Sequence, residues 1–185
     1  MISKKLIKKF IKNNNYGTIL NFFGSLTSKS NFIKYAITNN DEINMHILND
    51  FTNVDEIKDK IIKYVFLDLD FYGDLYILLK FASSKLKNDE EFISKILEQS
   101  GMFLEFVDDK FKDDKNTVLK AVNKNGQSYK YCSERLKSDK EIFLIAYENF
   151  ILHPLTRDDD YYNPAYYCDK KLLKDKDVKE LIEKY

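Results

Sequence analysis

The sequence predicts an all-α fold: a short stack of antiparallel helix pairs, made of 25-residue helix-turn-helix repeats, with a divergent N-terminal helical cap. Two observations predict this class. Similar segments recur every 25 residues in the second half of the chain, and repeats of this length are typical of stacked supersecondary units. The chain also holds only 5 Gly and 2 Pro, too few for a protein built from many tight turns.

Residues 1–74 are expected to form the cap, because they do not follow the 25-residue register. Residues 1–12 have the pattern of a basic amphipathic helix. We expect its apolar side to pack on a neighbouring helix; contact with an anionic surface is the alternative. Residues 54–67 are predicted to form a longer helix, because apolar residues recur in them at helical spacing. These residues are Ile57, Ile61, Ile62, Val65 and Phe66.

Residues 75–185 are expected to form the repeat array. Segments 85–89, 110–114 and 135–139 share the order basic, apolar, lysine, polar, aspartate. A fourth copy, 167–175, follows the third at a spacing of 36 instead of 25. Each copy is expected to hold a first helix, a glycine-containing turn and a second helix. The pairs must stack, because so short a pair cannot bury its apolar face alone.

The copy at 114–138 shows how the helix ends are specified. Its first helix carries an apolar side made of Val118, Leu119, Ala121 and Val122. Gly126 is expected just past the end of that helix with a positive φ, because glycine tolerates the left-handed conformation common at helix C-termini. The second helix is expected to be lined by Tyr129, Tyr131, Cys132 and Leu136.

Aspartates recur where helices are expected to begin, and negative charge suits the positive end of the helix dipole. They are Asp89, Asp114, Asp139 and Asp175. The preceding residues Asn88 and Ser138, with Glu91 and Glu141, have the spacing of a capping box. We therefore interpret the recurring acids as structural rather than as a row of catalytic carboxylates.

The copy at 114–139 combines short motifs at fixed places: Asp114, Ala121-Val122, Asn125-Gly126, Tyr131-Cys132-Ser133, Leu136-Lys137 and Asp139. In these residues it resembles a repeat family of bacterial proteins catalogued as domain of unknown function 4116. The resemblance is strong over about 75–150, weaker at 160–185 and absent before 75. It implies a short α-helical repeat, and it assigns no activity and no functional residue.

The two cysteines occupy equivalent repeat positions. Ala82 and Val107 fill the same position in the other copies, and a position that accepts alanine, valine and cysteine is typical of small apolar packing sites, where free cysteine behaves as a small hydrophobe. We expect Cys132 and Cys168 to be buried and apart, without a disulfide. Two cysteines without a paired motif also indicate a reducing compartment, and we place the protein in the cytoplasm.

The charge distribution excludes some partners. Residues 1–40 hold 7 Lys and no acid, so the rest of this neutral chain has 23 basic and 30 acidic residues, a net charge of −7. A negative field repels phosphate, so we expect no nucleic acid on the repeats. No apolar run reaches the roughly 18 residues of a spanning helix, so no membrane span is expected.

The sequence contains no familiar catalytic or metal-binding constellation. His46 and His153 are the only histidines, and neither has neighbours at zinc-ligand spacing. No phosphate-binding glycine loop, nucleophile elbow or metalloprotease motif occurs. We therefore predict no catalytic residue, no cofactor and no metal.

One segment departs from the repeat. The third copy carries 11 extra residues (36 minus 25), bracketed by Pro154 and Pro164. Insertions in repeat proteins map to loops on one face, often the binding face. Tyrosine and arginine are also enriched in interface hot spots. A passive loop and a cation site remain alternatives. The candidate partner-contact residues in this loop are Arg157, Asp158, Asp159, Asp160, Tyr161 and Tyr162.

The sequence therefore predicts a non-enzymatic protein-protein interaction or scaffold module. A specific form is an acidic antidote or immunity-type protein that masks a basic partner, as electrostatic complementarity allows. The alternative is an enzyme whose site is assembled from dispersed residues near the 154–164 loop, for instance His153, Asp158, Asp159 and Tyr161.

Overall fold

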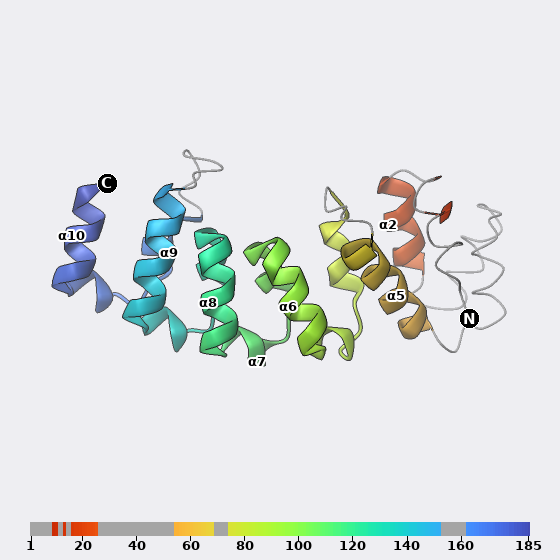
Figure 1. Ribbon diagram of the computed structural model, residues 1–185, viewed down its shortest axis with the longest axis horizontal. Helices are drawn as coiled ribbons and strands as arrows, with labels where there is room; N and C mark the ends of the chain where they lie inside the picture. The colour runs from red at the N-terminus through yellow and green to blue at the C-terminus, as the bar shows by residue number, and fades with distance from the viewer. Residues whose placement is uncertain (1–8, 11–12, 14–15, 26–53, 69–73, 153–161) are drawn as a thin grey trace. The chain divides into compact units, whose positions relative to one another are not determined.

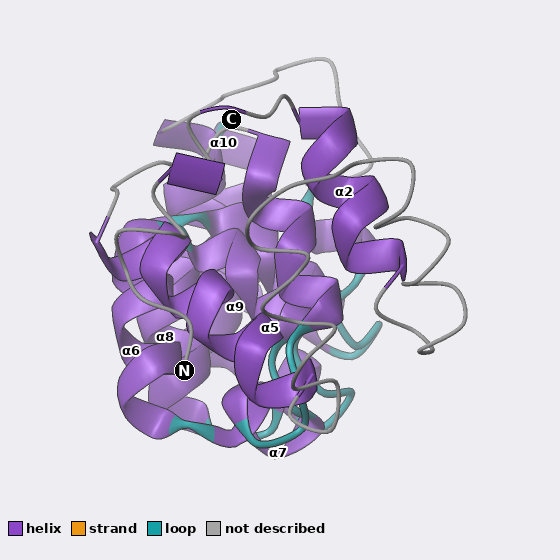
Figure 2. Ribbon diagram, turned by 90° about the vertical axis from the view of Figure 1, so that its right-hand side faces the viewer, coloured by secondary structure: helices purple, strands orange, loops and turns teal. Residues whose placement is uncertain are grey.

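The protein is all-α throughout the part of the chain that its computed structural model describes, which confirms the predicted fold class. The described residues are 9–10, 13, 16–25, 54–68, 74–152 and 162–185. Figure 2 shows them as helices joined by loops, with no strand. None of these helices is long and apolar enough to cross a membrane.

The chain divides into two compact units, Met1–Leu86 and Lys87–Tyr185. The predicted division into 1–74 and 75–185 was drawn from sequence register and stays a prediction. The first unit holds α2 (Tyr16–Ser25), α5 (Val54–Lys63), the π-helical turn η2 (Tyr64–Asp68) and the 3₁₀ helix η3 (Asp74–Phe81).

The predicted apolar face of residues 54–67 is confirmed. All five of its apolar residues, Ile57, Ile61, Ile62, Val65 and Phe66, are buried. Of the predicted basic helix at 1–12, only Lys9 and Phe10 are described. Phe10 is buried, with its ring 4.7 Å from that of Phe22 on α2. This contact fits the packing interpretation of that segment.

The second unit contains four longer α-helices that stand side by side in chain order (Figure 1). They are α6 (Glu90–Gln99), α8 (Lys115–Lys124), α9 (Lys140–Leu152) and α10 (Lys176–Lys184). The segments between them are η5 (Gly101–Phe106), α7 (Asp109–Lys112), η6 (Gly126–Tyr131), η7 (Leu136–Ser138), η9 (Pro164–Tyr166) and η10 (Leu172–Lys174). A further 3₁₀ turn, η4 (Leu86–Asn88), leads into α6.

The second helix of each pair is a short 3₁₀ helix rather than the expected α-helix. η5 and η6 each have only six residues and pack against the α-helix that precedes them. Such short segments are typical of 3₁₀ geometry, because its hydrogen bonds are poorer and longer runs are uncommon. Within η6 and the turn after it, Tyr129, Cys132 and Leu136 are buried as expected, whereas Tyr131 is half-buried.

The recurring aspartates cap the α-helices, which supports their structural interpretation. Each accepts a hydrogen bond from the backbone N–H three residues ahead, a typical N-cap contact. These bonds join Asp89 to Phe92 (3.0 Å), Asp114 to Thr117 (2.8 Å), Asp139 to Ile142 (3.2 Å) and Asp175 to Val178 (3.3 Å). The expectation that Asn88 and Ser138 are the caps is wrong by one residue, because each lies in the 3₁₀ turn that precedes the cap.

Gly126 does not have the predicted positive φ, and neither does Gly101. Gly126 begins η6, and the preceding residue, Asn125, ends α8 in an extended conformation. Glycine is needed there because the next α-helix approaches closely. A Cβ at Gly126 would lie 2.1 Å from the carbonyl oxygen of Ala146, and one at Gly101 would lie 2.0 Å from that of Ala121. Backbone packing, not backbone conformation, selects glycine at both positions.

Backbone hydrogen bonds of equivalent repeat positions tie the loops together. The bonds run from N–H to C=O as Asp108 to Lys87 (3.3 Å), Ser133 to Lys112 (2.9 Å) and Asp169 to Lys137 (3.1 Å). Donor and acceptor are 21 residues apart in the first two bonds and 32 apart in the third. The third bond therefore spans the 11 extra residues, which confirms that the chain resumes its register after the insert.

Candidate functional site

The predicted partner-contact loop falls almost entirely outside the described residues. Arg157, Asp158, Asp159, Asp160 and Tyr161 lie there, as do both histidines. Only the last residue of the candidate set, Tyr162, is described. The loop's role as a contact surface therefore stays a prediction.

Tyr162 belongs to an aromatic cluster around the ammonium group of Lys130. The Lys130 Nζ atom lies 5.0 Å from the centroid of the Tyr162 ring, 5.6 Å from that of Tyr131 and 5.7 Å from that of Tyr167. The pKa of the Tyr131 phenol is raised by burial, then by the nearby Glu105 and Tyr162. The Lys130 ammonium occupies the space among the three rings. Through these contacts the cluster connects the end of the insert to η6.

The two cysteines are free, and only one is buried. Cys132 is 4% exposed, and burial raises the pKa of its thiol to about 12. Cys168 is half-buried, so the expected burial of both is wrong for the second. The equivalent Ala82 and Val107 are buried, which confirms the small apolar packing position.

Two helix contacts of the second unit are bridged by a lysine at the same repeat position. In the α8–α9 junction, the contact between these two helices, the Lys115 ammonium lies 2.7 Å from Asp139 and 2.8 Å from Glu141. The hydrogen bonds that the Lys115 ammonium donates to these two carboxylates raise the pKa of Lys115. The lysine thus crosses from the first residue of one helix to the first turn of the next.

The α9–α10 junction repeats this arrangement. The Lys140 ammonium, 25 residues after Lys115, lies 2.8 Å from Asp175 and 2.6 Å from Asp177. Both acids are 36 residues after their counterparts in the previous junction. The same hydrogen bonds raise the pKa of Lys140 and lower that of Asp175. A lysine between two acidic side chains is therefore a repeated element of the stack.

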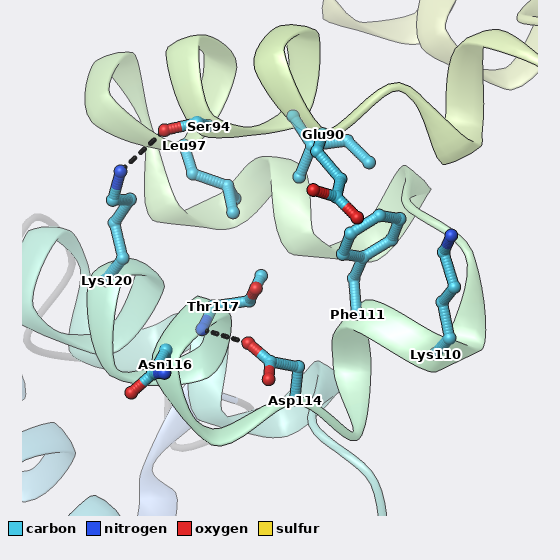
Figure 3. Close-up of a pocket in the computed structure, with 10 residues that line it drawn as sticks. Glu90, Ser94, Leu97, Lys110, Phe111, Asp114, Asn116, Thr117 and Lys120 are labelled. Carbon is cyan, nitrogen blue, oxygen red and sulfur yellow. Dashed lines mark hydrogen bonds between the residues drawn. The ribbon is translucent and has the colours of Figure 1, made fainter.

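The α6–α8 junction lacks this lysine. Glu90 stands at the position of Lys115, while Asp114 and Asn116 stand at the positions of the two acids. An open groove of about 460 Å³ lies here, between α6 and α8 with α7 at one end (Figure 3). Glu90 faces it from α6, and Asp114 faces it from the start of α8. We call it the α6–α8 groove.

The floor of the α6–α8 groove is apolar. Ile93 and Leu97 of α6 and Phe111 of α7 line it, and all three are largely buried in the protein core. Phe111 stands where the other copies have Leu86 and Leu136. Polar and charged side chains surround this floor, so the groove combines an apolar surface with a negatively charged end.

Two lysines of this chain also line the α6–α8 groove, but neither takes the place of the missing one. The Lys120 ammonium lies at the other end, 2.6 Å from Ser94 Oγ and 3.1 Å from Glu98 (Figure 3). The Lys110 ammonium lies over the neighbouring Phe111 ring, 4.6 Å from its centroid. Among the described residues, no cationic group lies within salt-bridge distance of Glu90 or Asp114.

Sequence reasoning did not identify Glu90 as a candidate residue, although the signal was present. The capping aspartates share one register, and so does the residue directly after each of them. That residue is Lys115 in one copy, Lys140 in the next and Glu90 in the first. Only the structure shows that this position contacts the following repeat, so the change of charge gains meaning there.

Comparison with protein families gives one match, to the domain of unknown function DUF4116, over residues 58–112 and 114–152. The match begins before residue 75, so the expectation of no resemblance there is wrong. The 25-residue register does not reach this part of the chain, because α5 begins at Val54, whereas the register would place a helix start near residue 65. The match does not cover 160–185, where the resemblance was weaker.

No curated protein and no solved structure is significantly similar to this chain. The family match covers 94 of the 185 residues, in two stretches that run from within α5 to the end of α9. These stretches include the capping aspartates Asp89, Asp114 and Asp139, the packed glycines Gly101 and Gly126, and both sides of the α6–α8 groove. The chain therefore belongs to the DUF4116 family.

Proposed function

We propose that this protein is a non-enzymatic interaction module that binds another protein with a basic surface. The observation that carries the proposal is the α6–α8 groove, which opens at a helix contact and has carboxylates at one end and an apolar floor. Repeat stacks commonly bind partners through surfaces formed by consecutive units. An acidic antidote that masks a basic effector is the specific form we favour, with the cytoplasm of a bacterium as its place of action.

Two further features support binding over chemistry. The net charge of −7 after residue 40 attracts a basic partner and speeds its encounter. The thiol of Cys132 is buried and has a raised pKa, the opposite of what a nucleophilic cysteine needs. An enzyme with a site built from His153, Asp158, Asp159 and Tyr161 is the alternative, and those residues lie outside the described part of the chain.

The test begins with affinity capture on the full-length chain from cells of the source organism. Each captured protein is then purified separately, and its binding is measured by isothermal titration calorimetry at several salt concentrations. We expect one basic protein to bind with a fixed stoichiometry. Its affinity should fall as salt rises, because salt screens attraction between exposed charges. Absence of any stoichiometric partner, or an affinity that does not change with salt, would contradict the proposal.

A further inference from the structure

We infer that the α6–α8 groove takes the side chain of a lysine from the partner, whose ammonium group would bind between Glu90 and Asp114. The inference rests on the proposed function and specifies the contact that the partner makes. The molecule's own repeats hold a lysine at this place in the following two junctions.

The internal lysines show that the site suits an ammonium group. Lys115 and Lys140 each contact the aspartate that caps the next helix and the acidic residue two positions later. A cation at the start of a helix is normally unfavourable, because the helix dipole is positive there. The capping carboxylate and the second acid overcome this effect twice in the same protein.

In the α6–α8 junction the acceptors remain while the lysine is absent. Asp114 caps α8 as Asp139 caps α9. Asn116 keeps a side-chain oxygen at the position of the second acid, and Glu90 adds a carboxylate where the lysine would begin. The site therefore keeps oxygen acceptors and gains one negative charge, and both carboxylates are exposed, so a cation from a partner can reach them.

The apolar floor fits the aliphatic stem of a lysine. Lysine side chains commonly bury their methylene groups on apolar surface while the ammonium group stays hydrated. Here Phe111, at 7% exposed, is the most accessible of the three apolar residues that line the groove next to the two carboxylates. Lys120 is held at the far end by Ser94 and Glu98, so it leaves the acidic end accessible.

Lys110 is the competitor within the chain. Its ammonium lies over the Phe111 ring and not against Glu90 or Asp114. If it turned into the groove it would satisfy the site without a partner. The test therefore includes the variant Lys110→Ala, in which this competitor is removed.

The experiment is an NMR titration of the ¹⁵N-labelled full-length chain with the peptide acetyl-Gly-Lys-Gly-amide. The same peptide with norleucine in place of lysine keeps the stem and removes the charge. We expect the lysine peptide to shift mainly the backbone amides at the start of α6 and of α8, with weak, millimolar affinity. The norleucine peptide should bind about fivefold more weakly, the upper end of what an exposed ion pair contributes.

Two variants with the same charge change make the test specific. Glu90→Lys supplies the missing lysine from within the chain, so it should reduce binding of the peptide about fivefold. Glu148→Lys makes the same change at an exposed residue of α9 outside the groove, and it should leave the binding site unchanged. Lys110→Ala should bind the peptide as well as the original chain, or better.

Shifts spread evenly over all acidic surfaces, or binding that survives Glu90→Lys, would overturn the inference. So would binding that appears only in Lys110→Ala, since Lys110 would then be the natural occupant. If the full-length chain has a stoichiometric partner that binds Glu90→Lys and the original chain equally, the groove assignment fails while the proposed function stands. If no partner is found, the proposed function fails as well.

Discussion

The α6–α8 and α8–α9 junctions have the same backbone contacts and different surface charges. In both, a glycine packs against the backbone of an alanine 20 residues later: Gly101 with Ala121, and Gly126 with Ala146. The glycine N–H donates to an asparagine side chain in both, at 2.8 Å to Asn125 and 2.7 Å to Asn149. The charges differ: Lys115 bridges the second junction, whereas Glu90 leaves the first unbridged.

The difference separates what holds the stack together from what the stack presents to its surroundings. The glycine contact is buried and rigid, so little variation is tolerated there. The lysine bridge lies at the surface, with the Lys115 side chain 42% exposed. Exposed ion pairs contribute little to stability, with a median of about 0–1 kcal/mol. A junction without the lysine bridge can therefore still fold, and its unbridged carboxylates are available for binding.

The largest effect is expected from the shared contact. Gly126→Ala should lower the free energy of unfolding by about 2–4 kcal/mol, because the added methyl group meets the backbone of α9, which cannot move without repacking the core. Gly101→Ala should have a similar effect. Urea unfolding of both variants checks this, with the exposed Lys124→Ala as control. A loss at only one of the two glycines would mean that the junctions are not equivalent.

A smaller loss is expected at the asparagine that accepts the bond from Gly101. Asn125→Ala should lower the free energy of unfolding by about 1–3 kcal/mol, because the buried Gly101 N–H loses its acceptor. Hydrogen exchange of the Gly101 amide is the direct measurement, and the exchange should accelerate. Protection of that amide equal to the original chain would show that another group accepts the bond.

The next pair of variants addresses the difference between the junctions. Asp139→Asn keeps a capping side chain but loses the ion pair with Lys115, whereas Asp114→Asn has no such pair to lose. We expect thermal unfolding to show that Asp139→Asn lowers the free energy of unfolding by about 0.2–1 kcal/mol and that Asp114→Asn changes it less. Equal losses in the two variants would indicate that the lysine bridge contributes nothing to the stack.

The smallest effect is expected in the pH dependence of stability. Hydrogen bonds from Lys140 lower the pKa of Asp175 from its ordinary value of 3.8. The pKa of Asp139 is also lowered, because bonds from Lys115 and the backbone outweigh its burial. A carboxyl group with a lowered folded pKa stabilises the protein above pH 3.8, and this stability disappears as the pH falls through the folded value.

Thermal unfolding between pH 6 and pH 2 should therefore show a loss that begins near pH 4. In Asp139→Asn this loss should be shallower, because one of the contributing groups is absent. A stability profile of the original chain that is flat over this range would contradict the role of these aspartates.

Much of the repeat frame followed from sequence alone. The aspartates at 25-residue spacing predicted the starts of α6, α8 and α9. The small residues at the position of Cys132 predicted a buried packing position. These predictions succeed because both requirements are local. A cap needs a short acceptor next to its own helix, and the packing position needs a side chain of a given volume. Family membership followed for the same reason, because the pattern is carried by residues at fixed spacing.

The tertiary structure decided why glycine is needed at these positions and where the candidate site lies. Gly126 was correctly singled out, but its role depends on how closely Ala146 of the next helix approaches, a distance that no local pattern contains. Likewise, Glu90 is an ordinary exposed acid in the sequence. It marks a candidate site only because packing places it in the same groove as Asp114, at the position from which Lys115 reaches Asp139 in the next junction. Spacing determines which positions are equivalent, but contacts between repeats determine what each position touches.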